Sequence, residues 1–404
     1  MRVLTVGNLY PPHHFGGYEQ VWRSAVRHLR ANGHTARVLA TDWRLDGVAD
    51  GDEPDVHREL RWYWAGHDFP RIPLAQRPPI ERHNAHVLAR HLDELEPDVV
   101  SFWSMGGMSH SLIERVRRRG LPMVAFVHDQ WLDYGRSFDQ WMRLFHAPRR
   151  RLAARAVDRL TGIPTRVDYA GAGRYVFVSD FVRRRALKLP EPVRDTAVAH
   201  SGIDPALVGP LPPEHDWSWR LLYVGRIHHD KGIHESVDAL AHLPGEATLT
   251  FAGKWDERDE DALVERARGL GVESRVTMLG QRSPAEVAEL MRAHDALLFP
   301  VLWEEPWGLV PIEAMAQGLP VVATGRGGGG EYMRDGENCL IVPARDPEAI
   351  ARAVERLAAD PELRRTLRAG GERTAPLHTE TVFNEQVEGH LLEVAGHAWE
   401  PVAA

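Results

Sequence analysis

The sequence predicts an α/β protein of two domains, each a parallel sheet wound with helices on both faces. Its 404 residues exceed one ordinary core and suggest two domains of roughly 150 to 200 residues each. The hydrophobic share of 43% supplies enough apolar residues for two cores. In both halves, short apolar runs alternate with stretches of helical periodicity, which is typical of wound parallel sheets.

The apolar runs predict the strands of the two sheets. They lie at residues 3–6, 36–40, 99–103, 123–127 and 175–178 in the first half, and at 221–224, 247–252, 276–279, 296–299, 320–323 and 339–342 in the second. Residues 193–219 hold a proline cluster and little helical pattern, so we expect a connection there. The predicted domains are residues 1–200 and 219–376, with a linker at 201–218 and a C-terminal helix within 377–404.

Composition excludes several classes of protein. No apolar run reaches the roughly 18 residues that span a bilayer, and the first residues predict a strand rather than a signal peptide. We therefore expect a soluble, cytoplasmic protein. The single cysteine, Cys339, excludes an intramolecular disulfide and a cysteine-based metal cluster, and its apolar neighbours place it in a core.

Charge is distributed unevenly along the chain. Residues 1–200 carry 30 Lys and Arg against 23 Asp and Glu, whereas residues 201–404 carry 19 against 34. The basic first half, with arginine triplets at 149–151 and 183–185, suits an anionic partner or peripheral contact with a membrane surface, although solvated helix faces explain the triplets equally well. The net charge of −8 and the absence of a known nucleic-acid module predict no nucleic-acid partner.

The stretch at 303–320, WEEPWGLVPIEAMAQGLP, predicts a binding loop between a buried strand and a helix that ends at Gly318. Gly308 allows the backbone to approach a ligand closely, and the amides of the first helical turn point toward it. The helix dipole favours negative charge at the same point. A phosphate group would be bound well there.

Glu305 and Glu313 flank this helix start with seven residues between them, so both can face one pocket. A carboxylate repels a phosphate, so the pairing makes sense where the carboxylates accept hydrogen bonds from ribose and sugar hydroxyls while other groups bind the phosphates. The pattern therefore indicates a nucleotide-sugar site. The alternative is that Glu313 is an ordinary acid in the first turn of a helix.

The expected phosphate-binding cations follow the strand at 221–224. Gly225 is followed by Arg226, which can make bidentate contacts, and by Lys231, which supplies a point charge. Both would stabilise a diphosphate as it leaves. Lys231 is one of only three lysines, at 188, 231 and 254, against forty-six arginines, so its presence is informative.

These motifs resemble those of retaining glycosyltransferases of family 4, which have the GT-B fold. The resemblance rests on Glu-x7-Glu with Pro-Trp-Gly and Ala-Met-Ala after its two acids, and on Gly-Arg-x4-Lys-Gly. It implies two Rossmann-like domains facing a central cleft, with the C-terminal helix crossing back to the first domain. It also implies transfer of a sugar from a nucleotide-diphosphate sugar to a saccharide or small-molecule hydroxyl, with retention and without a cofactor or obligatory metal.

The resemblance assigns a role to each motif residue. Arg226 and Lys231 would stabilise the diphosphate, Glu313 would bind the ribose, and Glu305 would lie near the transferred sugar. Further donor contacts would come from a short set of neighbours: Gly225, Trp307, Gly308, Leu309 and Val310. The glycine run at 327–330 with Glu331 would lie on the donor side, although its spacing is compressed and flexibility alone explains many such runs.

In the first half, Gly16 and Gly17 form a loop at a helix start that resembles the family's phosphate-facing loop, although most such pairs are only turns. The pattern is not the G-x-G-x-x-G fingerprint, which weakens a dehydrogenase interpretation. His128 follows the strand at 123–127, where ligands of wound sheets gather, and in the resembling family a histidine here contacts the transferred sugar. A histidine bonding its own loop backbone is the alternative.

Aromatic residues of the first half are candidates for acceptor binding, since flat rings suit sugars or apolar aglycones. We assign this role to Trp103, Trp131 and Tyr134, with 62–64 as a further aromatic group; equally, such residues are often core. The acidic cluster at 259–261 lies in a charged helix start without a matching strand end, so no metal site is predicted there.

Two other functions remain open from the residues. A GT-B nucleotide-sugar epimerase would bind the same donor but use no acceptor, and incubation with a nucleotide sugar alone would reveal isomerisation. A catalytically silent binding protein is the second alternative, and the intact cations and glutamates argue against it. The sugar, the base and the acceptor are not specified by these motifs.

Overall fold

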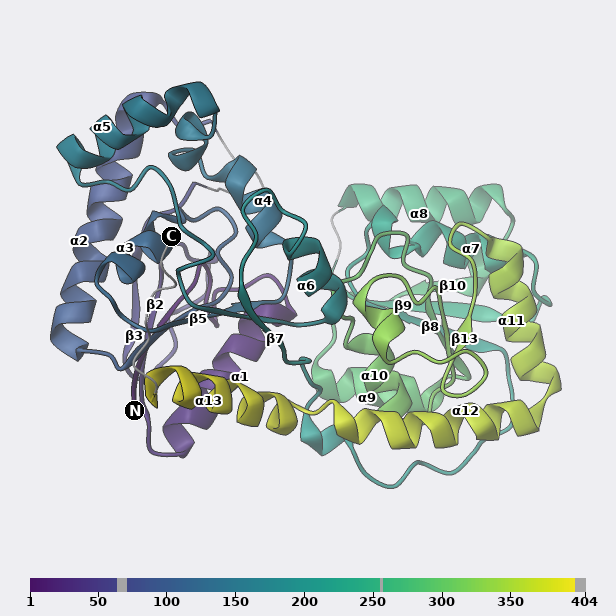
Figure 1. Cartoon of the computed structure of the whole chain (residues 1–404). Helices are drawn as coiled ribbons and strands as arrows, with labels where there is room; N and C mark the ends of the chain where they lie inside the picture. The colour runs from purple at the N-terminus through teal and green to yellow at the C-terminus, as the bar shows by residue number, and fades with distance from the viewer. Residues whose placement is uncertain (64–70, 255–256, 397–404) are drawn as a thin grey trace. The chain divides into compact units, whose positions relative to one another are not determined.

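A computed structural model describes residues 1–63, 71–254 and 257–396 and divides into two compact units (Figure 1). The first unit contains Met1–His200 and the chain from Phe383 onward, and the second contains Ser201–Val382. Each unit is built around one parallel sheet.

The first unit has a seven-stranded sheet in the order β3-β2-β1-β4-β5-β6-β7, and every pairing is parallel. Its strands are β1 (Arg2–Val6), β2 (Thr35–Thr41), β3 (Val56–Leu60), β4 (Val99–Phe102), β5 (Met123–Val127), β6 (Arg174–Phe177) and β7 (Asp195–Val198). All five apolar runs predicted in this half are strands.

The two strands that the sequence did not predict, β3 and β7, are the edges of this sheet. Residues 195–198 were expected in the connection between domains, and that prediction was wrong. Most side chains of β3 and β7 are only partly buried, so neither strand has the apolar signal of a central parallel strand.

The helices of the first unit are α1 (Gly17–Ala31), α2 (Arg77–Leu95), α3 (Ser111–Arg118), α4 (Trp131–Phe138), α5 (Arg151–Thr161) and α6 (Asp180–Ala186). The last helix, α13 (Glu380–Gly396), belongs to this unit from Phe383 onward. Phe383, Val387 and Leu391 are buried in one cluster with Trp22 of α1 and with residues of the central strands. The C-terminal helix thus completes the core of the first unit.

The second unit has a six-stranded parallel sheet in the order β10-β9-β8-β11-β12-β13. Its strands are β8 (Arg220–Val224), β9 (Thr248–Ala252), β10 (Val276–Met278), β11 (Ala296–Phe299), β12 (Val321–Ala323) and β13 (Leu340–Ile341). All six predicted runs are strands, and two wound parallel sheets are confirmed.

The helices of the second unit cover both faces of its sheet, with α7 and α8 on one side and α9, α10 and α12 on the other (Figure 1). They are α7 (Ile233–Ala241), α8 (Glu257–Gly269), α9 (Pro284–Ala293), α10 (Val310–Ala316), α11 (Pro347–Ala359) and α12 (Pro361–Thr374). Cys339 is fully buried beside β13, as expected. Within the described ranges, no helix has both the length and the apolar character needed to cross a bilayer.

The chain from Ser201 to Ser218 belongs to the second unit and is fastened to it by hydrogen bonds. Trp307 Nε1 donates to the Ser201 carbonyl at 2.8 Å, and Gln317 Nε2 donates to the Leu207 carbonyl at 2.9 Å. A Cβ at Gly202 would lie 1.9 Å from the backbone of Thr379, so only glycine allows this close approach.

Candidate active site

The predicted binding loop runs from the end of β11 to α10, at the carboxyl end of a central strand of the second unit. Pro311 occupies the first turn of α10 and supplies no N–H. Among the described residues, none accepts a hydrogen bond from the backbone N–H of Gly308, Leu309 or Val310. These three amides are therefore available to an anionic ligand, as the sequence predicts.

Two glycines shape the loop around Glu305. Gly308 has φ +87°, and a Cβ there would lie 3.3 Å from Glu305 Cγ. Gly327 has φ +74°, and a Cβ there would lie 2.3 Å from the Glu305 carbonyl oxygen, which accepts from the Gly328 N–H at 2.7 Å. The start of the glycine run thus packs backbone to backbone against the Glu305 loop, a support role that the sequence did not predict.

Lys231 and Glu305 form an ion pair, with Nζ 2.5 Å from Oε2. Their side chains are 17% and 13% exposed. Trp303 Nε1 also donates to Glu305 Oε2 at 2.9 Å, and Lys231 Nζ lies 4.6 Å from the centre of the Trp303 ring. The sequence analysis assigned Lys231 to the diphosphate and Glu305 to the transferred sugar. In the folded protein, the two side chains pair with each other.

The backbone positions Lys231 through its neighbour Gly232. This glycine has φ +74°, and a Cβ there would lie 2.0 Å from the Pro300 carbonyl oxygen at the end of β11. No other residue fits without moving the two segments apart. The close contact explains why glycine follows lysine in the motif.

Arg226 is the other predicted cation, and its side chain is exposed beyond the end of β8. Its carbonyl accepts a hydrogen bond from the Tyr223 hydroxyl at 3.0 Å. Within the described chain, no carboxylate lies within ion-pair distance of its guanidinium group. Arg226 can therefore bind an anion without first giving up a protein partner.

Glu313 lies in the first turn of α10, and burial raises the pKa of its carboxyl group to about 7. Within the described ranges, no residue donates a hydrogen bond to this carboxylate. An ordinary first-turn acid is solvated and ionised, so the structure does not match that alternative well. A partly buried carboxylate that the described residues leave without a donor suits a hydroxyl ligand.

Trp307, predicted to bind the donor, is only 3% exposed. Its ring packs against Tyr332 at 4.9 Å between centroids, and the Tyr332 hydroxyl donates to the Gly308 carbonyl at 2.6 Å. The indole is therefore a core group that positions the loop, and direct donor contact by this ring is not supported.

In the first unit, Gly16 and Gly17 are exposed at the start of α1, and a Cβ at Gly17 would meet open space. The Gly16 N–H donates to Glu19 Oε2 at 3.0 Å, which caps the helix. Burial raises the pKa of Glu19 to about 7. The loop can admit a ligand close to its backbone.

His128 follows β5 and stacks on Tyr18 with 4.6 Å between ring centroids. The Tyr18 hydroxyl donates to the Phe126 carbonyl and so fixes the stack. Burial lowers the pKa of His128 to about 3, which keeps the imidazole neutral and suited to hydrogen bonding with a hydroxyl. The sequence missed Tyr18, although its position directly after the glycine pair was a usable signal.

The acceptor-binding prediction requires a correction. Trp103 and Trp131 are 1% and 0% exposed, so their rings are occupied by core packing. Tyr134 is partly buried, and its hydroxyl donates to Asp129 Oδ2 at 2.7 Å. Aromatic spacing alone does not distinguish these core rings from binding surfaces. Of the group at 62–64, Trp64 lies outside the described residues.

The described residues contain two groups of His and acidic side chains with metal-ligand spacing: His57 with Glu59 and His91, and His228 with His229 and Asp230. The second group lies between Arg226 and Lys231, but its three ligands are consecutive, and His229 is exposed. Adjacent residues rarely satisfy one coordination sphere.

Comparisons with known proteins identify the family. The model for "Glycosyltransferase Family 4" matches residues 15–207, and that for "Glycosyl transferases group 1" matches residues 213–374. Glycogen synthase of Mycobacterium tuberculosis is 34% identical over 434 residues, covering 98% of this chain and 96% of that protein. The chain belongs to glycosyltransferase family 4.

Other similar proteins also transfer sugars. A D-inositol 3-phosphate glycosyltransferase of Rhodococcus erythropolis is 32% identical over 249 residues, covering 59% of this chain and 50% of that protein. A lipopolysaccharide core biosynthesis glycosyltransferase of Rhizobium meliloti is 38% identical over 154 residues, covering 38% of this chain and 44% of that protein. The alternative function of an epimerase is not supported by these relatives.

Solved structures confirm the GT-B fold of this glycosyltransferase. Sucrose-phosphate synthase of Thermosynechococcus elongatus superposes with a TM-score of 0.71 at 20% identity, over 98% of this chain and 99% of that one. HepE of Anabaena in complex with UDP gives 0.70 at 20% identity, over 97% and 100%. At this identity the likeness concerns the fold alone.

Proposed function

We propose that this glycosyltransferase moves a sugar from a nucleoside-diphosphate sugar to a hydroxyl of a saccharide or other small acceptor, with retention of the anomeric configuration and without an obligatory metal. The observation that carries the proposal is a set of side chains in the second unit: Arg226, which has no ion-pair partner among the described residues, the Lys231–Glu305 pair, and the partly buried Glu313. Two cations beside two acceptors suit a diphosphate beside hydroxyl groups.

In the proposed reaction, the bond between the anomeric carbon and the diphosphate oxygen breaks, and its electron pair stays on the diphosphate. The acceptor oxygen forms the new bond on the face that the diphosphate leaves, and the acceptor proton passes to a phosphate oxygen. Arg226 and Lys231 stabilise the charge that develops on the leaving group. Two protein cations at the diphosphate do the work that a divalent ion does in other nucleotide-sugar sites, which supports metal independence.

The ion pair fixes Lys231 and Glu305 with respect to each other. A diphosphate competes with Glu305 for Lys231, so binding releases the Glu305 carboxylate to accept a hydrogen bond from the sugar. Trp303, which also donates to Glu305 Oε2, keeps the carboxylate oriented in the meantime. Glu313 accepts from the ribose hydroxyls.

The support for a saccharide or phosphorylated acceptor comes from the names of similar proteins. Their names indicate a glucan, an inositol phosphate and a lipopolysaccharide core as acceptors. We therefore propose a hydroxyl-rich acceptor for this chain.

A thermal-shift screen of nucleotide sugars followed by product analysis tests the proposal. The stabilising donor should be consumed in the presence of saccharide acceptors, the new linkage should keep the donor's anomeric configuration by NMR, and activity should persist in EDTA. An inverted linkage would overturn retention. Loss of activity in EDTA that Mg²⁺ or Mn²⁺ restores would overturn metal independence.

A further inference from the structure

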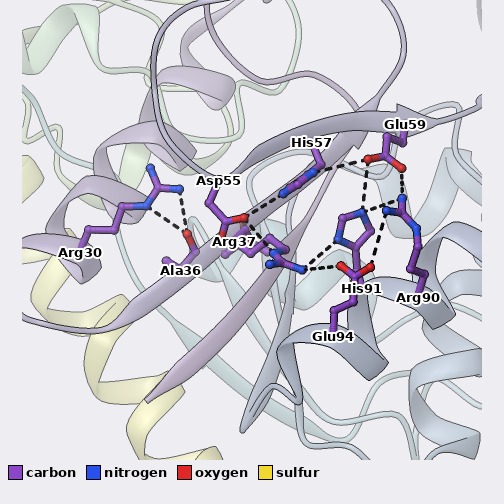
Figure 2. Close-up of polar contacts among 10 residues, drawn as sticks. Arg30, Ala36, Arg37, Asp55, His57, Glu59, Arg90, His91 and Glu94 are labelled. Carbon is purple, nitrogen blue, oxygen red and sulfur yellow. Dashed lines mark hydrogen bonds and ion pairs between the residues drawn. The ribbon is translucent and has the colours of Figure 1, made fainter.

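A cluster of metal-ligating side chains lies in the first unit, outside the residues proposed for sugar transfer. His57 and Glu59 are two positions apart on β3, so their side chains emerge on the same face of the strand. His91 comes from α2, which packs against β3. Figure 2 shows the three side chains pointing toward one another.

We propose that His57, Glu59 and His91 form a Zn²⁺ site that clips the edge strand β3 to α2. His57 Nδ1 lies 3.4 Å and His91 Nε2 lies 3.6 Å from the same oxygen, Glu59 Oε1, and one ligand atom from each residue lies within 4.8 Å of the others. In a tetrahedral zinc site with bonds of about 2.1 Å, neighbouring ligand atoms are about 3.4 Å apart. The donor set therefore needs little rearrangement, and a water molecule would complete it.

The residues around the cluster supply the outer partner that zinc ligands need. Asp55 Oδ1 lies 2.8 Å from His57 Nε2, so it can accept the proton on that nitrogen and leave Nδ1 free for a metal. This carboxylate also pairs with Arg37 Nε at 2.9 Å, which holds it in place. A carboxylate–histidine–metal arrangement of this kind fixes the ring orientation.

Two arginines neighbour the cluster and must be compatible with a cation. Arg90 Nη2 pairs with Glu59 Oε2 and lies 3.5 Å from His91 Nε2, so metal binding requires Arg90 to leave His91 while keeping Glu59. Its side chain is 40% exposed, which permits the change. Arg37 Nη1 lies 3.4 Å from His91 Nδ1 but only 3.2 Å from Glu94 Oε2, so its firmer contacts do not involve the imidazole.

The charges and the position in the fold favour the site. Three carboxylates, of Asp55, Glu59 and Glu94, face two guanidinium groups, which leaves an excess of negative charge for a divalent cation. Among the described strands, the edge strand β3 pairs with β2 alone, so a metal bridge to α2 adds a tether that the sheet does not provide.

Metal titration of the chelator-treated, dialysed full chain tests the inference. Zn²⁺ should bind at one equivalent in competition with a chromophoric chelator, and Co²⁺ should give the intense visible absorption of a four-coordinate site. His57→Gln and Glu59→Gln should each weaken binding at least tenfold, and Asp55→Asn by about 10- to 100-fold. Zn²⁺ should also raise the Tm of the wild type but not of His57→Gln.

His86→Gln is the matched control, because His86 is exposed on the same helix and should leave the affinity unchanged. Circular dichroism confirms that the variants fold, and His57 and Glu59 are both partly exposed, so their replacement should not unfold the unit. No saturable binding of Zn²⁺ or Co²⁺ by the wild type would overturn the inference. So would binding that survives in His57→Gln but is lost in the His228→Gln/His229→Gln double variant.

Discussion

Lys231 and Glu305, 74 positions apart in the sequence, meet with 2.5 Å between Nζ and Oε2. Their partial burial makes the contact stronger than an exposed ion pair. The pairing joins the two strongest motifs of the chain within the second unit. Lys231 is therefore paired with a carboxylate, whereas Arg226 has no ion-pair partner among the described residues.

Replacement of either cation by alanine should reduce turnover severely while leaving the fold intact. Lys231→Ala and Arg226→Ala each remove charge needed mainly as the leaving group forms, and such a loss costs about 3 to 4 kcal/mol, or roughly two to three orders of magnitude in rate. Steady-state kinetics with the donor found by screening measures the effect. Lys188→Ala, an exposed lysine of the first unit, should retain wild-type turnover. Near-normal turnover in Lys231→Ala or Arg226→Ala contradicts the phosphate assignment.

Neutralising Glu305 should affect nucleoside-diphosphate affinity and turnover in opposite directions. Glu305→Gln removes the carboxylate that competes for Lys231, so the affinity for a free nucleoside diphosphate should rise about threefold to tenfold, the size of a partly buried ion pair. Turnover should fall, because the transferred sugar loses its acceptor group. Calorimetric titration of the nucleoside diphosphate checks the first effect, with Glu289→Gln on the exposed face of α9 as control. Weaker binding by Glu305→Gln would show that the carboxylate does not compete.

Glu313→Gln should weaken nucleoside-diphosphate binding more than it slows chemistry, since ribose contacts are similar in the ground and transition states. The ionised carboxylate is the better hydroxyl acceptor, so wild-type affinity should rise as the pH passes through about 7, and this dependence should vanish in the variant. Calorimetric titrations at pH 6 and pH 8 measure both effects. Equal affinities of the two proteins would return Glu313 to a structural role.

The pKa of Glu313 also predicts a stability effect of defined sign. Its folded pKa of about 7 exceeds the ordinary value of 4.5, so the folded state holds the proton more tightly and loses stability as the pH rises from about 4.5 to 7. Glu313→Gln lacks this penalty and should unfold at a higher temperature than the wild type at pH 8, but not at pH 5. A difference of the opposite sign would mean that the carboxylate is stabilised by the fold.

Two glycine variants can distinguish the stability lost through a steric contact with the Glu305 loop from the stability lost through a positive φ. Gly327→Ala places a Cβ 2.3 Å from the Glu305 carbonyl oxygen at φ +74°, whereas Gly336→Ala has φ +73° with open space around it. Both should lose about 1 kcal/mol or more of stability from the positive φ, and Gly327→Ala should lose a further 1 to 3 kcal/mol. Urea unfolding measures the difference. Equal losses would indicate that the loop can move away freely.

The sequence by itself determined the two wound sheets, the strands at their centres and the donor motifs. Central strands of a parallel sheet are buried on both faces, so β5 and β11 are continuous apolar runs and β1 and β8 are largely apolar, which can be read without a structure. The motif glycines were visible in the sequence as part of local patterns. The contact that requires Gly232, with the Pro300 carbonyl, joins distant segments and is known only from the structure.

Only the tertiary structure decided which residues are buried and which distant groups meet. Trp103 and Trp131 look like binding rings in the sequence but are core, because burial depends on segments that cover them. The edge strands β3 and β7 were missed, since a partly exposed strand needs fewer apolar residues. The Lys231–Glu305 pair and the approach of His91 to His57 and Glu59 are long-range contacts, formed when packing brings separate elements together, and no local pattern encodes them.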